Sequence, residues 1–267
     1  MNSTANCTFI ISVLLSLSLM ISCDFTPRRQ KRVLDAQNYI AEQKYQKAIY
    51  EYEKVLTSNP PPGVKVKIYY QLGELYSTYL ANHKKALFYY EKIKNEASVP
   101  LWTVRAEEKI AELNFTYLKD YVAAISSYKK LSSFVPRLKS VDFFENRLGI
   151  SYLKNGEIDK AVETFLAIRN NEKHEYFIRS AYYMGLAYFE KEDWPKAVYF
   201  FNEYIKGETR KDNIAQAKFL KANAYENDDR LKKAYDIYYS ILGEYPNSDV
   251  IRKRLNSIYE RKVARKR

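Results

Sequence analysis

The sequence predicts an all-α protein, a right-handed solenoid of six helix-turn-helix repeats followed by a C-terminal capping helix. Three observations support this fold class. The chain includes only 7 Gly and 8 Pro, which is too few for the many tight turns of a β-sandwich or a doubly wound fold. An alanine followed four positions later by an aromatic residue recurs six times, and Tyr is unusually abundant, with 26 copies. Regular recurrence of this kind predicts stacked helix pairs.

The alanine–aromatic motif predicts the second helix, helix B, of each repeat. The six pairs are Ala48/Tyr52, Ala86/Tyr90, Ala124/Tyr128, Ala161/Phe165, Ala197/Phe201 and Ala234/Tyr238. The alanines recur at nearly even spacing, and another large apolar residue lies three positions after each aromatic. Because offsets of four and three share one helix face, each motif marks a buried helical stripe.

A second motif precedes each alanine and predicts helix A. It consists of an aromatic residue nine positions before the alanine, or ten in repeat 2, and a small residue three positions earlier. The small residues are Ala36, Gly73, Gly149, Gly185 and Ala222. The same count puts Glu112 at the small position of repeat 3 and assigns the extra residue of repeat 2 to a loop at 80–83. Two helices approach closely only where a side chain is missing, so we expect each small residue to face the ring of helix B.

This pattern resembles the tetratricopeptide repeat (TPR), in which small-x-x-Tyr on helix A precedes Ala-x-x-x-Phe on helix B. Gly149-x-x-Tyr152 followed by Ala161-x-x-x-Phe165 matches it at full spacing. The resemblance covers about residues 31–246 and implies a protein that binds other proteins along a concave face lined by helix A. The Lys/Asn/Arg clamp of chaperone-binding TPR proteins is not reproduced, so a carboxy-terminal chaperone ligand is not expected.

Residues 1–22 contain no charged side chain and include an apolar run over 9–21. This run is too short to cross a bilayer, which needs about 20 residues, but it suits the apolar region of a secretory signal. Met20-Ile21-Ser22-Cys23 resembles a bacterial lipobox, in which the cysteine is lipidated after cleavage. We therefore predict a lipoprotein signal peptide at 1–22 and lipidation of Cys23. The alternative is an ordinary signal peptide or short anchor with a chance cysteine, because the segment before the apolar run lacks Lys and Arg.

The rest of the chain is divided into a polar tether at 23–31, six repeats at 32–246 and a capping helix with a basic tail at 247–267. Val250, Leu255 and Ile258 are spaced as one apolar face of that helix, and Ser248 or Asp249 is expected to cap it. The basic tail comprises Arg261, Lys262, Arg265, Lys266 and Arg267 in a chain whose formal net charge is +12. We expect the tail to touch anionic lipid, peptidoglycan or an acidic partner.

The TPR resemblance places the partner-binding groove on helix A, at positions one after, three before and six before the small residue. The predicted groove residues are Lys67, Tyr70, Glu74, Phe143, Asn146, Arg179, Tyr182, Phe219 and Asn223, and Ile150, Leu186 and Gln216 occupy equivalent positions. Aromatic side chains among polar ones suit a peptide docked by apolar anchors. For each residue singly, packing between repeats is the alternative interpretation.

An enzyme is not expected, because the chain has no G-x-G-x-x-G, Walker or G-x-S-x-G motif. His83 and His174 belong to different repeats and are expected to face solvent, so no catalytic residue, metal or cofactor is predicted. We expect a scaffold that is lipid-anchored in the cell envelope and faces the periplasm. The BamD and type IV pilus pilotin lipoproteins, which also combine a lipobox with TPRs, suggest a role in assembling an envelope machine.

Two other functions remain open at this point. One is an adaptor for peptidoglycan synthesis or polysaccharide export, and the other is a basic module that binds anionic surfaces. Nucleic-acid binding is not expected, because the export signal argues against it and most of the charge is interleaved Lys and Glu.

Overall fold

The structure is a computed structural model that describes residues 26–265, and over this range it is entirely helical, without strands. Cys23, the predicted signal peptide, Lys266 and Arg267 lie outside the described residues. The α-helices are α2 (Thr26–Ala41), α3 (Tyr45–Thr57), α4 (Pro62–Glu74), α5 (His83–Glu96), α6 (Pro100–Glu112), α7 (Tyr121–Ser132), α8 (Val141–Lys154), α9 (Ile158–Arg169), α10 (Phe177–Glu190), α11 (Trp194–Gly207), α12 (Lys211–Asn227), α13 (Leu231–Ser240) and α14 (Ser248–Ala264). Two π-helical segments, η1 (Leu75–Tyr79) and η2 (Leu113–Leu118), extend α4 and α6.

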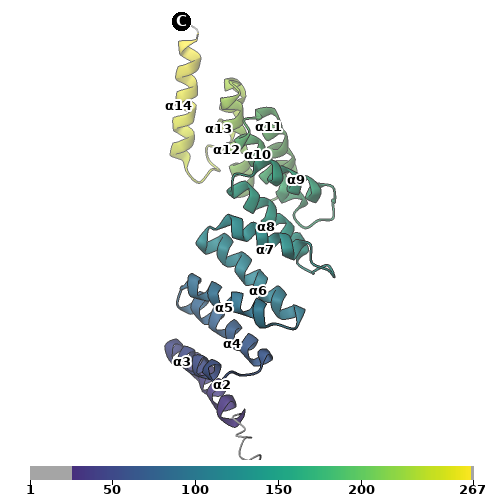
Figure 1. The fold of residues 1–267 in the computed structure, drawn as a ribbon. Coiled ribbons are helices and arrows are strands. Elements are labelled where there is room, and N and C mark those ends of the chain that lie inside the picture. The colour runs from purple at the N-terminus through teal and green to yellow at the C-terminus, as the bar shows by residue number, and fades with distance from the viewer. Residues whose placement is uncertain (1–25, 266–267) are drawn as a thin grey trace, which may run out of the picture. The chain divides into compact units, whose positions relative to one another are not determined.

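The chain divides within α6 into two compact units, residues 1–106 and 107–267. The described part of the first unit contains the pair α2/α3, the pair α4/α5 and the beginning of α6. The second unit contains the end of α6, η2 and α7, then the pairs α8/α9, α10/α11 and α12/α13, and finally α14. Figure 1 shows that successive helices run back and forth as hairpins. The six helix pairs and the terminal helix found within residues 26–265 confirm the predicted fold class.

Close helix crossings explain the alternation of small residues and rings. A Cβ atom added to Gly73 would lie 2.5 Å from the Tyr90 ring, and one added to Gly149 would lie 2.7 Å from the Phe165 ring. Neither separation is sterically possible without movement of the ring. The motif alanines of helix B are also fully buried in all six repeats. Helix A and helix B of a repeat therefore lock together where one contributes no side chain and the other contributes an aromatic ring.

The π-helical segments correct the predicted register of repeats 2 and 3. In η1 the Leu80 N–H donates to the Leu75 carbonyl, five positions earlier, at 3.2 Å. A wider π-turn takes up one extra residue, so the insertion of repeat 2 lies in the helix and not in the predicted loop. Repeat 3 has the same feature in η2. Its small residue is therefore the fully buried Ala111, one position before the predicted Glu112, which is exposed.

Both ends of the repeat array differ from the prediction in detail. Helix α2 begins at Thr26, so residues 26–31 of the predicted tether are helical, and Pro27 is tolerated because it lies in the first turn. At the other end, Asn247 caps α14 by accepting a hydrogen bond from the Val250 N–H at 3.2 Å. The cap is therefore neither Ser248 nor Asp249, which the sequence predicts for this role.

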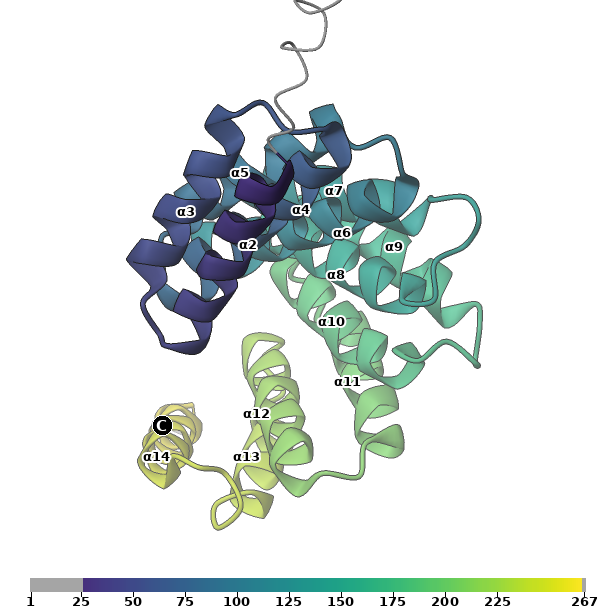
Figure 2. The same ribbon diagram turned by 90° about the horizontal axis from the view of Figure 1, so that it is seen from below.

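Helix α14 closes the last hydrophobic cluster of the second unit. Ile251, Leu255 and Ile258 are buried against α12 and α13, whereas Val250, expected on the same face, is only half-buried. Figure 2 shows α14 lying beside α13 at the end of the second unit. The apolar side of the last pair is thereby covered, as a solenoid requires.

Candidate partner-binding groove

The aromatic side chains three positions before the small residue pack on the helix-B ring of their own repeat. Ring centroids are 5.8 Å apart for Tyr70 and Tyr90, 6.2 Å for Tyr182 and Phe201, and 5.7 Å for Phe219 and Tyr238. The three predicted groove residues are half-buried, so each presents only part of its ring to a partner. Each ring therefore packs within its own repeat, and its exposed part is still accessible to a partner.

Repeat 4 departs from this arrangement. Asn146 stands where the other three repeats of the predicted groove carry a ring, and it is only 3% exposed. Its Oδ1 has no hydrogen-bond partner. Phe143 instead lies half-buried beneath the guanidinium of Arg147, 5.1 Å from the ring centroid. Asn146 is therefore a buried residue, and the prediction that it contacts a partner is corrected.

Two of the predicted polar groove residues bind their own repeat. The Tyr90 hydroxyl donates to Glu74, and the Tyr238 hydroxyl donates to Oδ1 of Asn223 at 2.9 Å. Where helix B carries Phe165 or Phe201, the residue after the small position is apolar: Ile150 or Leu186. The residue after the small position therefore correlates with the helix-B ring of the same repeat. It is polar where that ring is a tyrosine and apolar where it is a phenylalanine.

The corrected register brings repeat 3 under the same rule. Glu112 follows Ala111, and the helix-B ring of this repeat is Tyr128. Burial, opposed by Arg147 and assisted by the charge of Glu112, raises the pKa of Tyr128 to about 12. Tyrosine in helix B and a polar residue after the small position thus accompany each other in repeats 2, 3 and 6.

A hollow of about 470 Å³ lies between α10, the end of α11 and α12 in the second unit. It brings together three predicted groove positions, Arg179, Tyr182 and Gln216. The remaining lining residues are Glu175, Ile178, Tyr183, Tyr204, Gly207, Glu208, Arg210 and Asn213. Gly207 lies at its edge, where an added Cβ would lie 2.5 Å from Cδ1 of Ile178 and would displace the end of that side chain. We call this site the repeat 5–6 hollow.

Two acidic side chains, Glu175 and Glu208, line the repeat 5–6 hollow, and Glu208 already has hydrogen-bond donors within the protein. Glu208 accepts hydrogen bonds from the Tyr204 hydroxyl at 2.6 Å, the Asn213 amide at 2.8 Å, and the Thr209 and Arg210 N–H groups at 2.9 Å each. These donors, led by Tyr204 and the Arg210 N–H, lower the pKa of Glu208 to about 2. Burial, followed by the bond to Glu208, raises the pKa of Tyr204.

The two arginines of the repeat 5–6 hollow have no oppositely charged partner among the described residues. Arg179 and Arg210 are exposed, and neither forms an ion pair with a carboxylate among residues 26–265. They stand beside the rings of Tyr182 and Tyr204. The hollow therefore offers two guanidinium groups next to an aromatic wall, which suits a carboxylate adjoining an apolar side chain.

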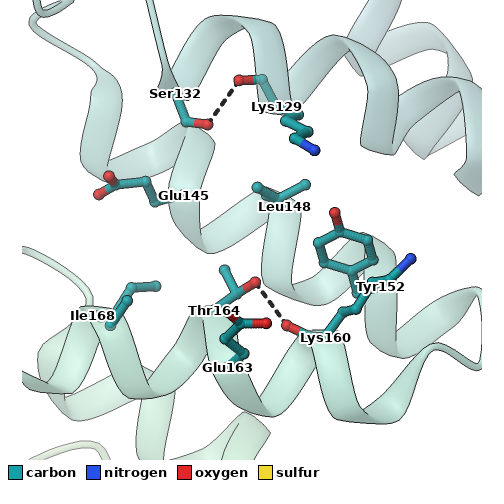
Figure 3. Close-up of a pocket in the computed structure, with 10 residues that line it drawn as sticks. Lys129, Ser132, Glu145, Leu148, Tyr152, Lys160, Glu163, Thr164 and Ile168 are labelled. Atoms are coloured by element: carbon teal, nitrogen blue, oxygen red, sulfur yellow. Dashed lines mark hydrogen bonds between the residues drawn. The ribbon is translucent and has the colours of Figure 1, made fainter.

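A second hollow, of about 520 Å³, lies on α7, α8 and α9 (Figure 3). Its α8 residues, Glu145, Leu148 and Tyr152, lie on the side of that helix away from Phe143 and Asn146, by helical spacing. Two of its hydroxyl groups donate to the backbone: Ser132 to the Lys129 carbonyl at 3.1 Å and Thr164 to the Lys160 carbonyl at 2.7 Å. These hydroxyls therefore belong to the helices that carry them.

A cluster of Asp142, Glu145 and His174 has the donor types of a metal site, with ligand atoms within 4.8 Å of one another. His174 is only 5% exposed, which corrects the expectation that it faces solvent. The Tyr176 N–H donates to Nδ1 at 3.0 Å, so the ring proton lies on Nε2, which donates to Glu145 at 3.1 Å. Asp142 accepts from Arg137 at 2.9 Å. The cluster ties α8 to the loop before α10 through its own hydrogen bonds.

The basic tail also binds its own chain. Arg261 lies 3.3 Å from Glu226 and 3.4 Å from Asp229, and Arg265 forms two bonds to Asp229 at 2.7 and 2.8 Å. The Lys262 ammonium lies over the Tyr235 ring, 5.6 Å from its centroid. In the structure Arg261 and Arg265 hold α14 on the end of α12 and on the turn after it. Their side chains stay 41% and 53% exposed, so the partner contact expected from the sequence stays a prediction.

Comparison with known proteins agrees with the repeat assignment. A sequence profile of the tetratricopeptide repeat matches residues 179–206 and 216–248. A comparison with curated proteins found no match. None of the helices in the described part of the chain is long and apolar enough to cross a membrane.

Several solved structures are similar in fold at low sequence identity. A tetratricopeptide repeat protein from Parabacteroides merdae has a TM-score of 0.60 at 16% identity, with 88% of each chain covered. PilW, a type IV pilus biogenesis factor, has a TM-score of 0.54 at 16% identity, covering 86% of this chain and 98% of its own. PilF of Pseudomonas aeruginosa has a TM-score of 0.51 at 14% identity, covering 87% and 97%. The chain thus carries tetratricopeptide repeats and has the fold of a TPR protein, similar to proteins that include a pilus biogenesis factor.

Proposed function

We propose that the protein is a non-enzymatic scaffold, lipid-anchored at Cys23 and facing the periplasm, that binds a protein partner through helix A of repeats 5 and 6. Its role is the assembly of an envelope machine. The lipobox at 20–23 supports the anchor, and the similarity in fold to a pilus biogenesis factor supports the assembly role. Both TPR-profile matches fall in repeats 5 and 6.

The observation that carries the proposal is the repeat 5–6 hollow. Of its two carboxylates, Glu208 already accepts four hydrogen bonds, and the exposed Glu175 forms no ion pair with either arginine. Arg179 and Arg210 therefore have no carboxylate partner among the described residues. An exposed pair of arginines beside aromatic rings provides both an apolar contact and charge-assisted hydrogen bonds. The partner segment that fits is an acidic side chain or terminal carboxylate next to an apolar residue.

Site-specific photocrosslinking tests this proposal. A photoreactive phenylalanine analogue replaces Ile178, which lines the hollow and leaves both arginines in place, and in a matched control it replaces Tyr199, which is exposed on α11 outside the hollow. In envelopes of the source organism, position 178 is expected to give a discrete adduct that position 199 does not. Adding Arg210→Glu should abolish that adduct by charge repulsion. Equal adducts at both positions, or an adduct unchanged by Arg210→Glu, contradict the proposal.

The anchor is tested separately. The mature protein should begin at Cys23 and carry a fatty-acyl mass that Cys23→Ser lacks. Cells grown with a clickable fatty acid should label the wild type and not this variant. Equal labelling of both, or a mature amino terminus elsewhere, would show that Cys23 is not the attachment site.

A further inference from the structure

The first helix of the described chain opens with cations that its neighbours do not neutralise. Arg28, Arg29 and Lys31 lie in its first two turns, and none forms an ion pair with a carboxylate of residues 26–265. Arg32, by contrast, is paired with Glu51 of α3 at 2.6 Å. The three cations are therefore available to an external anionic surface.

An apolar hollow of about 390 Å³ lies beside these cations, between α2 and α4. Its wall is formed by Val33, Leu34, Val64 and Ile68, and Arg29, Gln30, Gln37, Pro61 and Lys67 complete the lining. Leu34 is 56% exposed and Val64 is 37% exposed, so the hollow presents apolar side chains to the surroundings. Apolar side chains next to Lys and Arg form the kind of surface that binds at a membrane interface.

Chain length limits how far this surface lies from the proposed anchor. Cys23 precedes Thr26, the first residue of α2, by three positions, so the connection spans at most about 11 Å. The headgroup region on each side of a bilayer is roughly 5–8 Å thick. A lipid on Cys23 therefore brings the first turn of α2 to the bilayer surface.

We propose that the surface formed by α2 and the start of α4 docks on a bilayer that contains anionic phospholipid. Arg28, Arg29 and Lys31 contact headgroup phosphates, and Leu34 and Val64 reach the boundary of the acyl region. The inference rests on the proposed lipidation of Cys23 and adds to it a second, non-covalent contact. Two such signals together give stable attachment, whereas one lipid chain alone gives marginal binding.

The chain offers a clean probe for this contact. Cys7 leaves with the signal peptide and Cys23 is acylated, so an introduced cysteine is the one free thiol of the mature protein. Leu34→Cys places an environment-sensitive fluorophore on the proposed surface, and Tyr239→Cys places it at an exposed position on α13 of the second unit. Each lipidated, labelled protein is reconstituted in phosphatidylcholine vesicles with and without phosphatidylglycerol.

With phosphatidylglycerol, the label at position 34 should shift to the blue and be quenched by a nitroxide on the lipid headgroup, whereas the label at 239 should not respond. Combining Arg28→Gln, Arg29→Gln and Lys31→Gln should reverse the shift, because each cation near an anionic surface contributes about fivefold. The ratio of docked to undocked protein should then fall roughly 100-fold. Replacing Lys139, Lys173 and Lys232 by Gln removes the same charge from exposed positions of the second unit and should leave the shift intact.

Several results would overturn the inference. The first is a fluorescence of the label at position 34 that does not change with phosphatidylglycerol. The second is a triple variant that docks as well as its charge-matched control. The third is a blue shift that occurs only when envelope protein is added. The last result would assign the surface to a protein partner. An unacylated mature protein would also remove its basis, and the mass of that protein reports this directly. The crosslink at position 178 is measured independently, so failure of the docking surface can be distinguished from failure of the proposed partner site.

Discussion

Gly149 has no room for a methyl group, because its missing side chain is the space occupied by the Phe165 ring at 2.7 Å. We expect Gly149→Ala to lower the free energy of unfolding by about 1–3 kcal/mol through overpacking. Gly243→Ala is the matched control, since an added Cβ there meets no atom within 4 Å. Urea midpoints measure both. A Gly149→Ala midpoint equal to that of the control would mean that the ring moves aside freely.

Glu208 should make the second unit sensitive to acid. Its pKa is lowered from the ordinary 4.5 to about 2, so the folded state favours the charged carboxylate. The stabilisation is complete above about pH 4.5 and is lost as the pH falls toward 2. Glu208→Gln should melt at a lower temperature than wild type at about pH 6, and the difference should shrink by about pH 2. A pH-independent difference would show that the charge of Glu208 is not what its four donors stabilise.

The single-residue features that could be predicted from the sequence are those that recur at fixed spacing along the chain. The small positions and their facing rings were predictable, because a missing side chain and an aromatic recur at fixed spacing. The burial of His174 was not, because it depends on Asp142 and Glu145 of an earlier repeat and on a backbone N–H. The polar role of Glu74 and Asn223 could have been found by comparing repeats, since tyrosine in helix B accompanies a polar residue after the small position.

The π-helical ends of α4 and α6 show how an element absorbs an insertion. Gly73 and Ala111 lie one position further from the motif alanine of their repeat than Gly149 and Gly185 do. The additional residue widens the last turn and leaves the crossing point of the helices unchanged. In repeat 3 the extra residue lies between the small residue and Phe115. A count of three positions back from Phe115 therefore reaches Glu112 and not Ala111.

Deletion of Thr78 tests this explanation. Thr78 is exposed within η1, and removing it gives repeat 2 the same spacing as repeat 4. We expect the urea midpoint to change by no more than the equivalent of about 1 kcal/mol, because an α-turn replaces the π-turn. Deleting Lys154, the exposed last residue of α8, makes the spacing of repeat 4 shorter than that of any other repeat. This deletion should destabilise by several kcal/mol through mispacking of Gly149 on Phe165, and equal losses from the two deletions would refute the role of η1 as a spacer.

At the scale of the whole molecule, we expect the basic tail to contribute to stability and the helix-A face to contribute to partner binding. Glu226 is buried, and Arg261 and Arg254 are its cationic neighbours at 3.3 and 3.6 Å. Arg261→Gln combined with Arg265→Gln should lower the free energy of unfolding, because the buried Glu226 carboxylate loses one of its two cationic partners and Asp229 loses both tail arginines. Arg252→Gln removes an arginine whose Asp249 contact is exposed and should cost less. Urea midpoints again compare the variants.

The same variants distinguish structure from recognition. Arg261→Gln with Arg265→Gln should leave the crosslink at position 178 intact at temperatures where the protein is folded. Loss of the crosslink without loss of stability would indicate that the tail contacts the partner, as the sequence predicts. The fold class was predictable because it needs only local periodicity, whereas the use of the tail depends on a pairing between distant parts of the chain, Arg265 and Asp229.

The division of the chain within α6 has an optical consequence. The protein has two tryptophans: Trp102, which packs edge-on to Tyr70 in the first unit, and Trp194, which packs on Phe189 in the second. Each unit therefore carries its own intrinsic fluorophore. With either tryptophan changed to phenylalanine, the remaining emission follows one unit alone, so the melting of the two halves can be recorded separately without any attached dye.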